Sequence, residues 1–196
     1  MDTFTQQLLQ QLAQGAVSQI GQKIGADEQT TNSALSSTIP LLFSALAKNA
    51  SEPAGAQELF KAVAEDHDGS ILDHMDSFLG NPESANGAGI LKHVLGSQQP
   101  AVTEGLTKNT GLESNQVAQI LQIAAPLVMG MLGKQQKQAN LDVDGLTGLL
   151  LGEKQTVEES NPDMMGMLNT LLDVNKNGSA LDEIFGMLGK FLGSKK

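Results

Sequence analysis

The sequence predicts an all-α protein of several helices, built from duplicated helical units and followed by a C-terminal helix–loop–helix hairpin. Apolar residues recur at intervals of three or four, and the alternation of apolar and polar residues typical of strands is absent. Gly, Pro and Asn separate the apolar runs at short intervals. With 196 residues, of which 40% are hydrophobic, the chain is long enough for one core and a small appendage.

The first part of the chain shows how each helix is expected to begin and end. A stripe at helical spacing ends at Gly25, which suits the left-handed C-cap position. Asp27 is placed to cap the next helix, which contains Pro40. Because an internal proline removes a backbone hydrogen bond, we expect a break near Thr38. The stripe consists of Phe4, Leu8, Leu9, Leu12, Val17 and Ile20.

The same pattern returns 86 positions later without a gap, which predicts an internal duplication. Gly111, Glu113 and Pro126 take the places of Gly25, Asp27 and Pro40, so a second break is expected near Ala124. We predict copies over about residues 1–50 and 87–136, packed around a pseudo-twofold axis. Their shared core is expected to contain Leu35, Leu41, Leu42, Phe43, Leu46, Leu121, Leu127, Val128, Met129 and Leu132.

Further helices are expected between and after the copies. Three short ones are predicted from "EPAGAQELFKAVAEDHD", "GSILDHMDSFLG" and "GAGILKHVLG", and one more from "NLDVDGLTGLLLG". The polar residues 153–162 are interpreted as a linker that ends the domain at 152. Residues 163–196 form the expected hairpin, whose apolar faces predict an intermolecular or inter-domain contact.

The composition argues against several classes of function. The absence of cysteine excludes disulfides and thiol chemistry. All twelve basic residues are Lys, and the net charge is −10, which argues against binding to nucleic acid. We find neither a secretory signal nor an apolar stretch of about 20 residues that would span a membrane, so we expect a cytoplasmic protein.

No motif indicates an enzyme. Neither G-x-S-x-G nor GxxxxGK[ST] occurs. A metal site made by His67 and His74 with neighbouring aspartates is conceivable, but we interpret these two histidines and His93 as surface residues. The glycines of "MGMLGK" (129–134) predict close helix packing, either inside the chain or with a partner.

Several segments resemble a known bacterial family. "DHDGSILDHMDSFLGN", "GAGILKHVLGSQQPAVTEGLTKNTGLESNQV" and "APLVMGMLGK" occur in the order found in the domain-of-unknown-function family 937, whose relatives include the YidB-like proteins. The resemblance covers roughly residues 1–155. It implies a helical fold and brings no known enzymatic activity.

"DVNKNGSALDEI" (173–184) resembles a calcium loop between apolar runs. Oxygen-bearing residues occupy loop positions 1, 3, 5 and 7, and Gly178 occupies position 6. Position 12, which should carry the closing carboxylate, is Ile184, so closure would need a shortened loop. The competing interpretation is a helix start capped by Ser179. The candidate metal ligands are Asp173, Asn175, Asn177, Ser179, Asp182 and Glu183.

These observations favour a non-catalytic helical scaffold or interaction protein that associates with itself or with another protein. Calcium is the one expected ligand, and no other cofactor is expected. One alternative is a helix-turn-helix DNA-binding protein, although residues 27–38 and 113–124, the would-be recognition helices, contain no Lys. The other alternative is a binder of a small apolar ligand between the copies.

Overall fold

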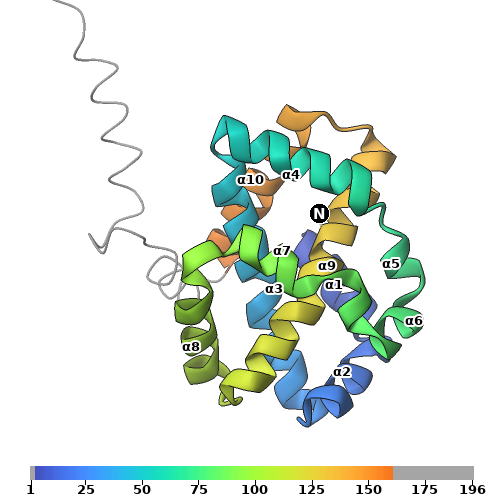
Figure 1. Ribbon diagram of the computed structural model, residues 1–196, viewed down its shortest axis with the longest axis vertical. Coiled ribbons are helices and arrows are strands. Elements are labelled where there is room, and N and C mark those ends of the chain that lie inside the picture. The colour runs from blue at the N-terminus through green and yellow to red at the C-terminus, as the bar shows by residue number, and fades with distance from the viewer. Residues whose placement is uncertain (1–2, 161–196) are drawn as a thin grey trace, which may run out of the picture.

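The computed structural model describes residues 3–160, and these are helical with short connections (Figure 1). No strand occurs within this range, which confirms the all-α prediction. The helices are α1 (Phe4–Leu12), α2 (Ala16–Ile24), α3 (Glu28–Ala50), α4 (Pro53–Asp66), α5 (Ser70–Asp73), α6 (Met75–Gly80), η1 (Pro82–Ala85), α7 (Gly87–Val94), η2 (Gly96–Gln98), α8 (Gln99–Thr110), α9 (Ser114–Ala139) and α10 (Val143–Ser160).

Two long helices, α3 and α9, form the centre of the molecule, with α7 crossing in front of them in Figure 1. Both continue through their prolines, so the breaks expected near Thr38 and Ala124 are wrong. An internal proline costs about 3 kcal/mol in a helix. Here residues 38–47 are all buried, and burial of this apolar stretch outweighs the cost of the missing hydrogen bond.

The helix ends lie where the sequence places them. Gly25 and Gly111 adopt left-handed conformations, with φ of 74° and 73°, and end α2 and α8. The Asp27 carboxylate accepts a hydrogen bond of 2.9 Å from the Thr30 N–H at the start of α3. At the start of α9, the Glu113 N–H donates over 2.9 Å to the side chain of Gln116. Local geometry is thus alike at positions 86 apart, and the duplication itself stays a prediction.

The two predicted copies share one core. All ten residues named for it are buried in a single cluster, as predicted. Polar contacts also join the copies: the Gln116 side chain donates to the Ile24 carbonyl over 3.1 Å, and the Asn109 side chain donates to the Ser37 hydroxyl over 3.2 Å. The copies therefore form one folded body.

Two expectations about the remaining helices need correction. The helix expected from "GSILDHMDSFLG" is divided at His74, where φ is −122° and ψ is 38°, into α5 and α6. The expected linker at 153–162 is helical through Ser160, because α10 continues past 152. Glu153 and Val157 are both buried. This part of α10 therefore has an inner face that packs against the other helices, although most of its residues are polar.

Candidate interaction surface

The candidate calcium ligands lie outside the described residues. Asp173, Asn175, Asn177, Ser179, Asp182 and Glu183 all follow residue 160, as does the expected hairpin 163–196. Their assignment stays a prediction.

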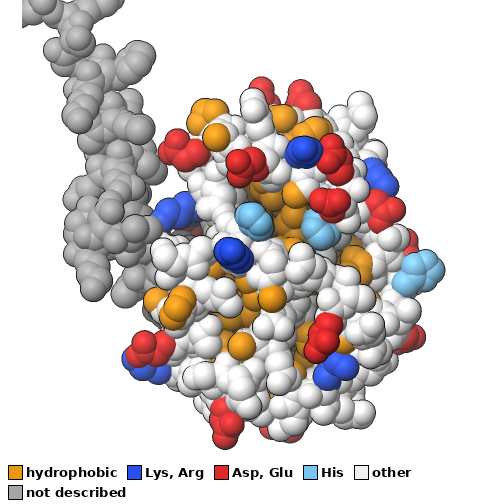
Figure 2. Space-filling model, viewed as in Figure 1, with side chains coloured by type: hydrophobic (Ala, Val, Ile, Leu, Met, Phe, Trp, Pro, Cys, Tyr) orange, Lys and Arg blue, Asp and Glu red, His pale blue; other side chains and the backbone are white. Residues whose placement is uncertain are grey.

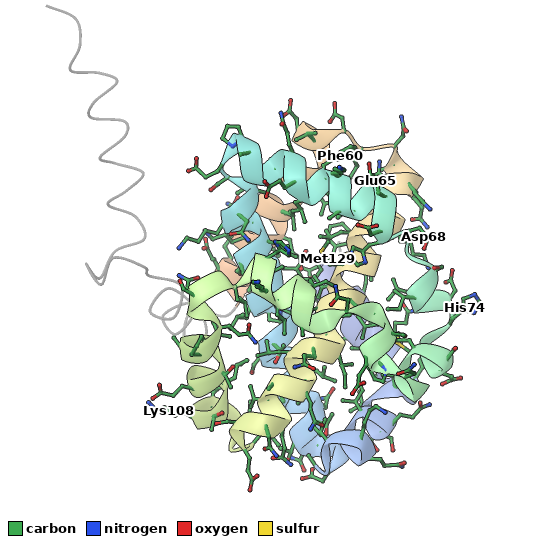
Figure 3. The ribbon with its side chains drawn as sticks, viewed as in Figure 1. Phe60, Glu65, Asp68, His74, Lys108 and Met129 are labelled. Atoms are coloured by element: carbon green, nitrogen blue, oxygen red, sulfur yellow. The ribbon has the colours of Figure 1, made fainter. Side chains whose placement is uncertain are left out.

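The histidines and nearby aspartates do not assemble into a metal site. Within residues 3–160, no three His, Asp or Glu side chains lie close enough to share a metal ion. His74 points away from the body at its edge (Figure 3). His67 is half-buried, and this burial lowers the pKa of its imidazole, which favours the neutral form. His93 is exposed on α7.

The aspartates of this region hold the α4–α5 connection in place. Hydrogen bonds from the Ser70 hydroxyl and N–H, with Lys137 nearby, lower the pKa of Asp68 from 3.8 to about 2. The Lys137 ammonium lies 3.5 Å from the Asp68 carboxylate. The Lys134 ammonium lies 3.4 Å from the carboxylate of Asp73. Two lysines of α9 therefore form ion pairs with the connection between α4 and α5.

The glycines of "MGMLGK" lie beneath this same connection. A Cβ on Gly133 would overlap the carbonyl oxygen of His67, and a Cβ on Gly130 would overlap the Ile71 side chain. Gly133 therefore lets the backbone of the connection lie directly on α9. Met129, labelled in Figure 3, is 4% exposed. Between the two interpretations of this motif, packing inside the chain is the one found.

Glu153, on the inner face of α10, makes a contact that the sequence analysis missed. Glu153 is 5% exposed, and its carboxylate accepts hydrogen bonds from the N–H groups of Phe4 (2.9 Å) and Thr5 (2.8 Å). These N–H groups belong to the first two residues of α1, and N–H groups at the start of a helix have no acceptor within it. A negative charge is also favoured at a helix N-terminus. The helical spacing of Leu146, Leu150, Glu153 and Val157 was the signal that could have revealed this face.

The outer face of α10 carries an exposed apolar strip formed by Gly148, Leu151 and Gly152, which we call the α10 strip. Residues three and four apart lie side by side on a helix. Leu151 is 45% exposed and is the one large exposed apolar side chain among residues 3–159. A Cβ added to Gly148 or Gly152 would meet nothing within 4 Å. The strip is thus an open surface on which another helix could lie closely.

A shallow depression lies elsewhere, between η2, α8 and the start of α9. Its volume is about 530 Å³, and among its lining residues only Pro100 has an apolar side chain. Sites for apolar small molecules are enclosed and mostly lined by hydrophobic side chains. This depression therefore offers no support for the apolar-ligand alternative. Its lining residues are Gly96, Ser97, Gln99, Pro100, Thr103, Glu104 and Ser114.

Comparison with known proteins identifies the family. The model of the family described as bacterial protein of unknown function (DUF937) matches residues 6–135, well over half of the chain. The chain belongs to the DUF937 family. No curated protein and no solved structure matches it. The DUF937 match ends within α9, so α10 with its strip and everything after it lie outside the matched region.

One described helix of this DUF937 protein is long and apolar enough to cross a membrane. It is α9, Ser114–Ala139, with a mean hydropathy of 1.4 over its most apolar window. That window is 78% buried inside the protein, as is usual for the central helix of a globular core. The sequence analysis found no such stretch, although only Gln119 and Gln122 interrupt the apolar and small residues of 117–133.

Proposed function

We propose that this DUF937 protein is a non-catalytic helical interaction protein that associates with itself through its C-terminal part. Residues 3–142 and the inner face of α10 would serve as a rigid body. The C-terminal part, from α10 onward, would supply the contact surface. Its sequence contains a second apolar face formed by Leu181, Ile184, Phe185, Leu188 and Leu192.

The observation that supports this proposal is the position of Leu151. Among residues 3–159 the other large apolar side chains are buried or half-buried, and the one exposed Leu lies on α10, the last described helix. Exposed apolar surface is typical of interaction sites.

The solution mass of the full chain tests the proposal. We expect light scattering to give a mass above that of the monomer, and Leu188→Asp to reduce it to the monomer by placing a charge on the apolar face. Lys190→Asp is the matched control, since it adds the same side chain two positions away, off that face, and should leave the mass unchanged. A parent protein that is monomeric at every attainable concentration contradicts self-association.

We further propose that the loop 173–184 binds calcium weakly, with Asp173 and Glu183 as its essential ligands. Two asparagines among the ligands lower the negative charge of the loop, which places its dissociation constant at about 10⁻⁴–10⁻³ M. Calorimetric titration of calcium into the full chain should give heat that Asp173→Ala abolishes. Absence of heat in the parent protein would leave only the helix-capping interpretation.

DNA binding is the second candidate, favoured by the two helix–turn–helix units α2–α3 and α8–α9 with their Gly25 and Gly111 turns. Charge argues against it. The face shown in Figure 2 carries acidic groups with lysines scattered singly among them, whereas DNA binding needs clustered cations. A gel-shift assay at low salt distinguishes the two functions, because an interaction protein of this charge should leave duplex DNA unshifted.

A further inference from the structure

Helix α10 binds to parts of the chain that are far from it in sequence. It packs mainly on α3 and α4, lying behind α4 in Figure 1, and its side chains Leu146, Leu150 and Val157 are at most 4% exposed. The Glu153 carboxylate accepts hydrogen bonds from the first two N–H groups of α1. Helices α5 to α9 all lie between α10 and these three helices in sequence. The α10 site is therefore a face formed by α1, α3 and α4, and the turn after α9 is the covalent link that brings α10 to it.

The turn that joins α9 to α10 is short and contains neither glycine nor proline. It consists of Asn140, Leu141 and Asp142. Asn140 ends α9 in the left-handed conformation, with φ of 49°, whereas α2 and α8 end at glycines in that conformation. A side chain makes this conformation unfavourable, although Asn tolerates it better than most residues. A straight course of the chain from α9 into α10 removes this cost and meets no helix-breaking residue.

The α10 site of a second copy fits α10 equally well, because the two copies are identical. If the turn straightens, α10 extends away from its own body, and its described 18 residues are roughly 27 Å long. Its apolar side chains and Glu153 then lie in water, and its own α1 loses the acceptor for its first N–H groups. Two copies that straighten together restore these contacts by exchanging α10, which is a low-cost route to a dimer.

We propose that two copies of this chain associate by exchanging α10, so that α10 of each copy occupies the α10 site of the other. This deepens the proposed function and rests on it, because it names the site on the second copy to which the C-terminal part binds. The exchanged contacts are the same in monomer and dimer and therefore favour neither state. The balance is set by the turn at Asn140 and by contacts that exist only in the dimer, for which the apolar face at 181–192 is the proposed source.

Single-cysteine variants test the exchange, since the chain has no cysteine of its own. Thr3 directly precedes the N–H groups that donate to Glu153, and Gly152 directly precedes Glu153, so the two positions are close across the contact of α1 with α10. Thr3→Cys and Gly152→Cys chains are unfolded together in urea and refolded as a mixture at a concentration that gives dimers. They are then treated with a short bis-maleimide that links the Thr3→Cys/Gly152→Cys double variant. We expect mass spectrometry to find residue 3 of one chain linked to residue 152 of another.

The control is a mixture of Gln22→Cys and Gly152→Cys chains. Gln22 is exposed on α2, which lies far from α10 in Figure 1, so this mixture should give no link between different chains. The proposal is overturned if the dimers of the double variant link residues 3 and 152 only within single chains and the Thr3→Cys and Gly152→Cys mixture gives no link.

The turn provides a second measurement. Asn140→Ala makes the left-handed conformation more costly and favours a continuous helix, so we expect the dissociation constant of the dimer to fall about tenfold, since each dimer has two turns. Asn140→Gly acts oppositely in both respects and should raise it by a similar factor. Gln138→Ala, an exposed position inside α9, is the matched control and should change it little. Equal dissociation constants for the two Asn140 variants would contradict the exchange.

These results separate the exchange from self-association itself. A parent chain that is monomeric at every attainable concentration would remove the proposed function and the exchange with it. A dimer that keeps all links between residues 3 and 152 inside single chains would remove the exchange alone and leave self-association in place.

Discussion

Helices α9 and α10 both carry paired glycines, but their surroundings are opposite. On α9, Gly130 and Gly133 are buried under the α4–α5 connection, and an added Cβ would overlap its atoms. On α10, Gly148 and Gly152 are exposed and an added Cβ would touch nothing. The comparison teaches that spacing alone shows where a close contact is possible, and only the fold shows whether the chain already makes it.

The largest expected effect is at the buried pair. Gly133→Ala places a methyl group against the His67 carbonyl, and since backbone must move to admit it, we expect a loss of about 2–3 kcal/mol in the free energy of unfolding. Urea denaturation followed by circular dichroism measures it. Stability equal to that of the parent would show that the connection yields easily and that the contact is not tight.

The inner face of α10 should be the next most sensitive. Glu153→Ala leaves the N–H groups of Phe4 and Thr5 without their acceptor in a buried place, at a cost of about 2 kcal/mol. Glu153→Gln keeps one accepting oxygen and should cost less. The same denaturation series compares the two variants. If they are equally destabilised, the charge rather than the acceptor is what α1 requires.

At the exposed pair the sign should reverse. Gly148→Ala adds a methyl group to open space and improves helix propensity, which alone would raise the free energy of unfolding by about 0.5–1 kcal/mol. A loss as large as that of Gly133→Ala would erase the contrast between α9 and α10.

The smallest effect concerns the pH dependence of the α4–α5 connection. The pKa of Asp68 is lowered to about 2 in the folded protein, so its stabilising contribution is present above its ordinary pKa of 3.8 and is lost as the pH falls from there toward 2. Asp68→Asn should therefore lower the Tm slightly at neutral pH, with the difference from the parent shrinking below pH 3.8. A difference that is constant with pH would assign the effect to the lost hydrogen-bond geometry instead.

The sequence was informative wherever a local rule decides the structure. Gly25, Gly111 and the caps after them follow from backbone conformation and hydrogen bonding within a few residues. The shared core was also predictable, because the apolar residues of 35–46 and 121–132 have nowhere else to be buried.

The errors arose where distant contacts override local preference. Pro40 and Pro126 do not end their helices, since burial on both sides maintains them. "EKQTVEES" is polar enough to be taken for a linker, and its helical state depends on Glu153 meeting α1 and on Val157 meeting the core. Neither partner can be identified from neighbouring residues. The candidate calcium ligands were not tested by the described residues, and their role stays a prediction.

The bond from Glu153 to α1 also has a consequence for synthesis on the ribosome. Phe4 and Thr5 emerge early, whereas their acceptor is translated 148 or more residues later. At about 5–20 residues per second, the start of α1 must wait many seconds for its acceptor. During that interval the N–H groups of Phe4 and Thr5 bond to water instead, and α1 lacks the hydrogen bonds from Glu153. Completion of the described body therefore requires α10, which is translated after the part of the chain that the family model matches.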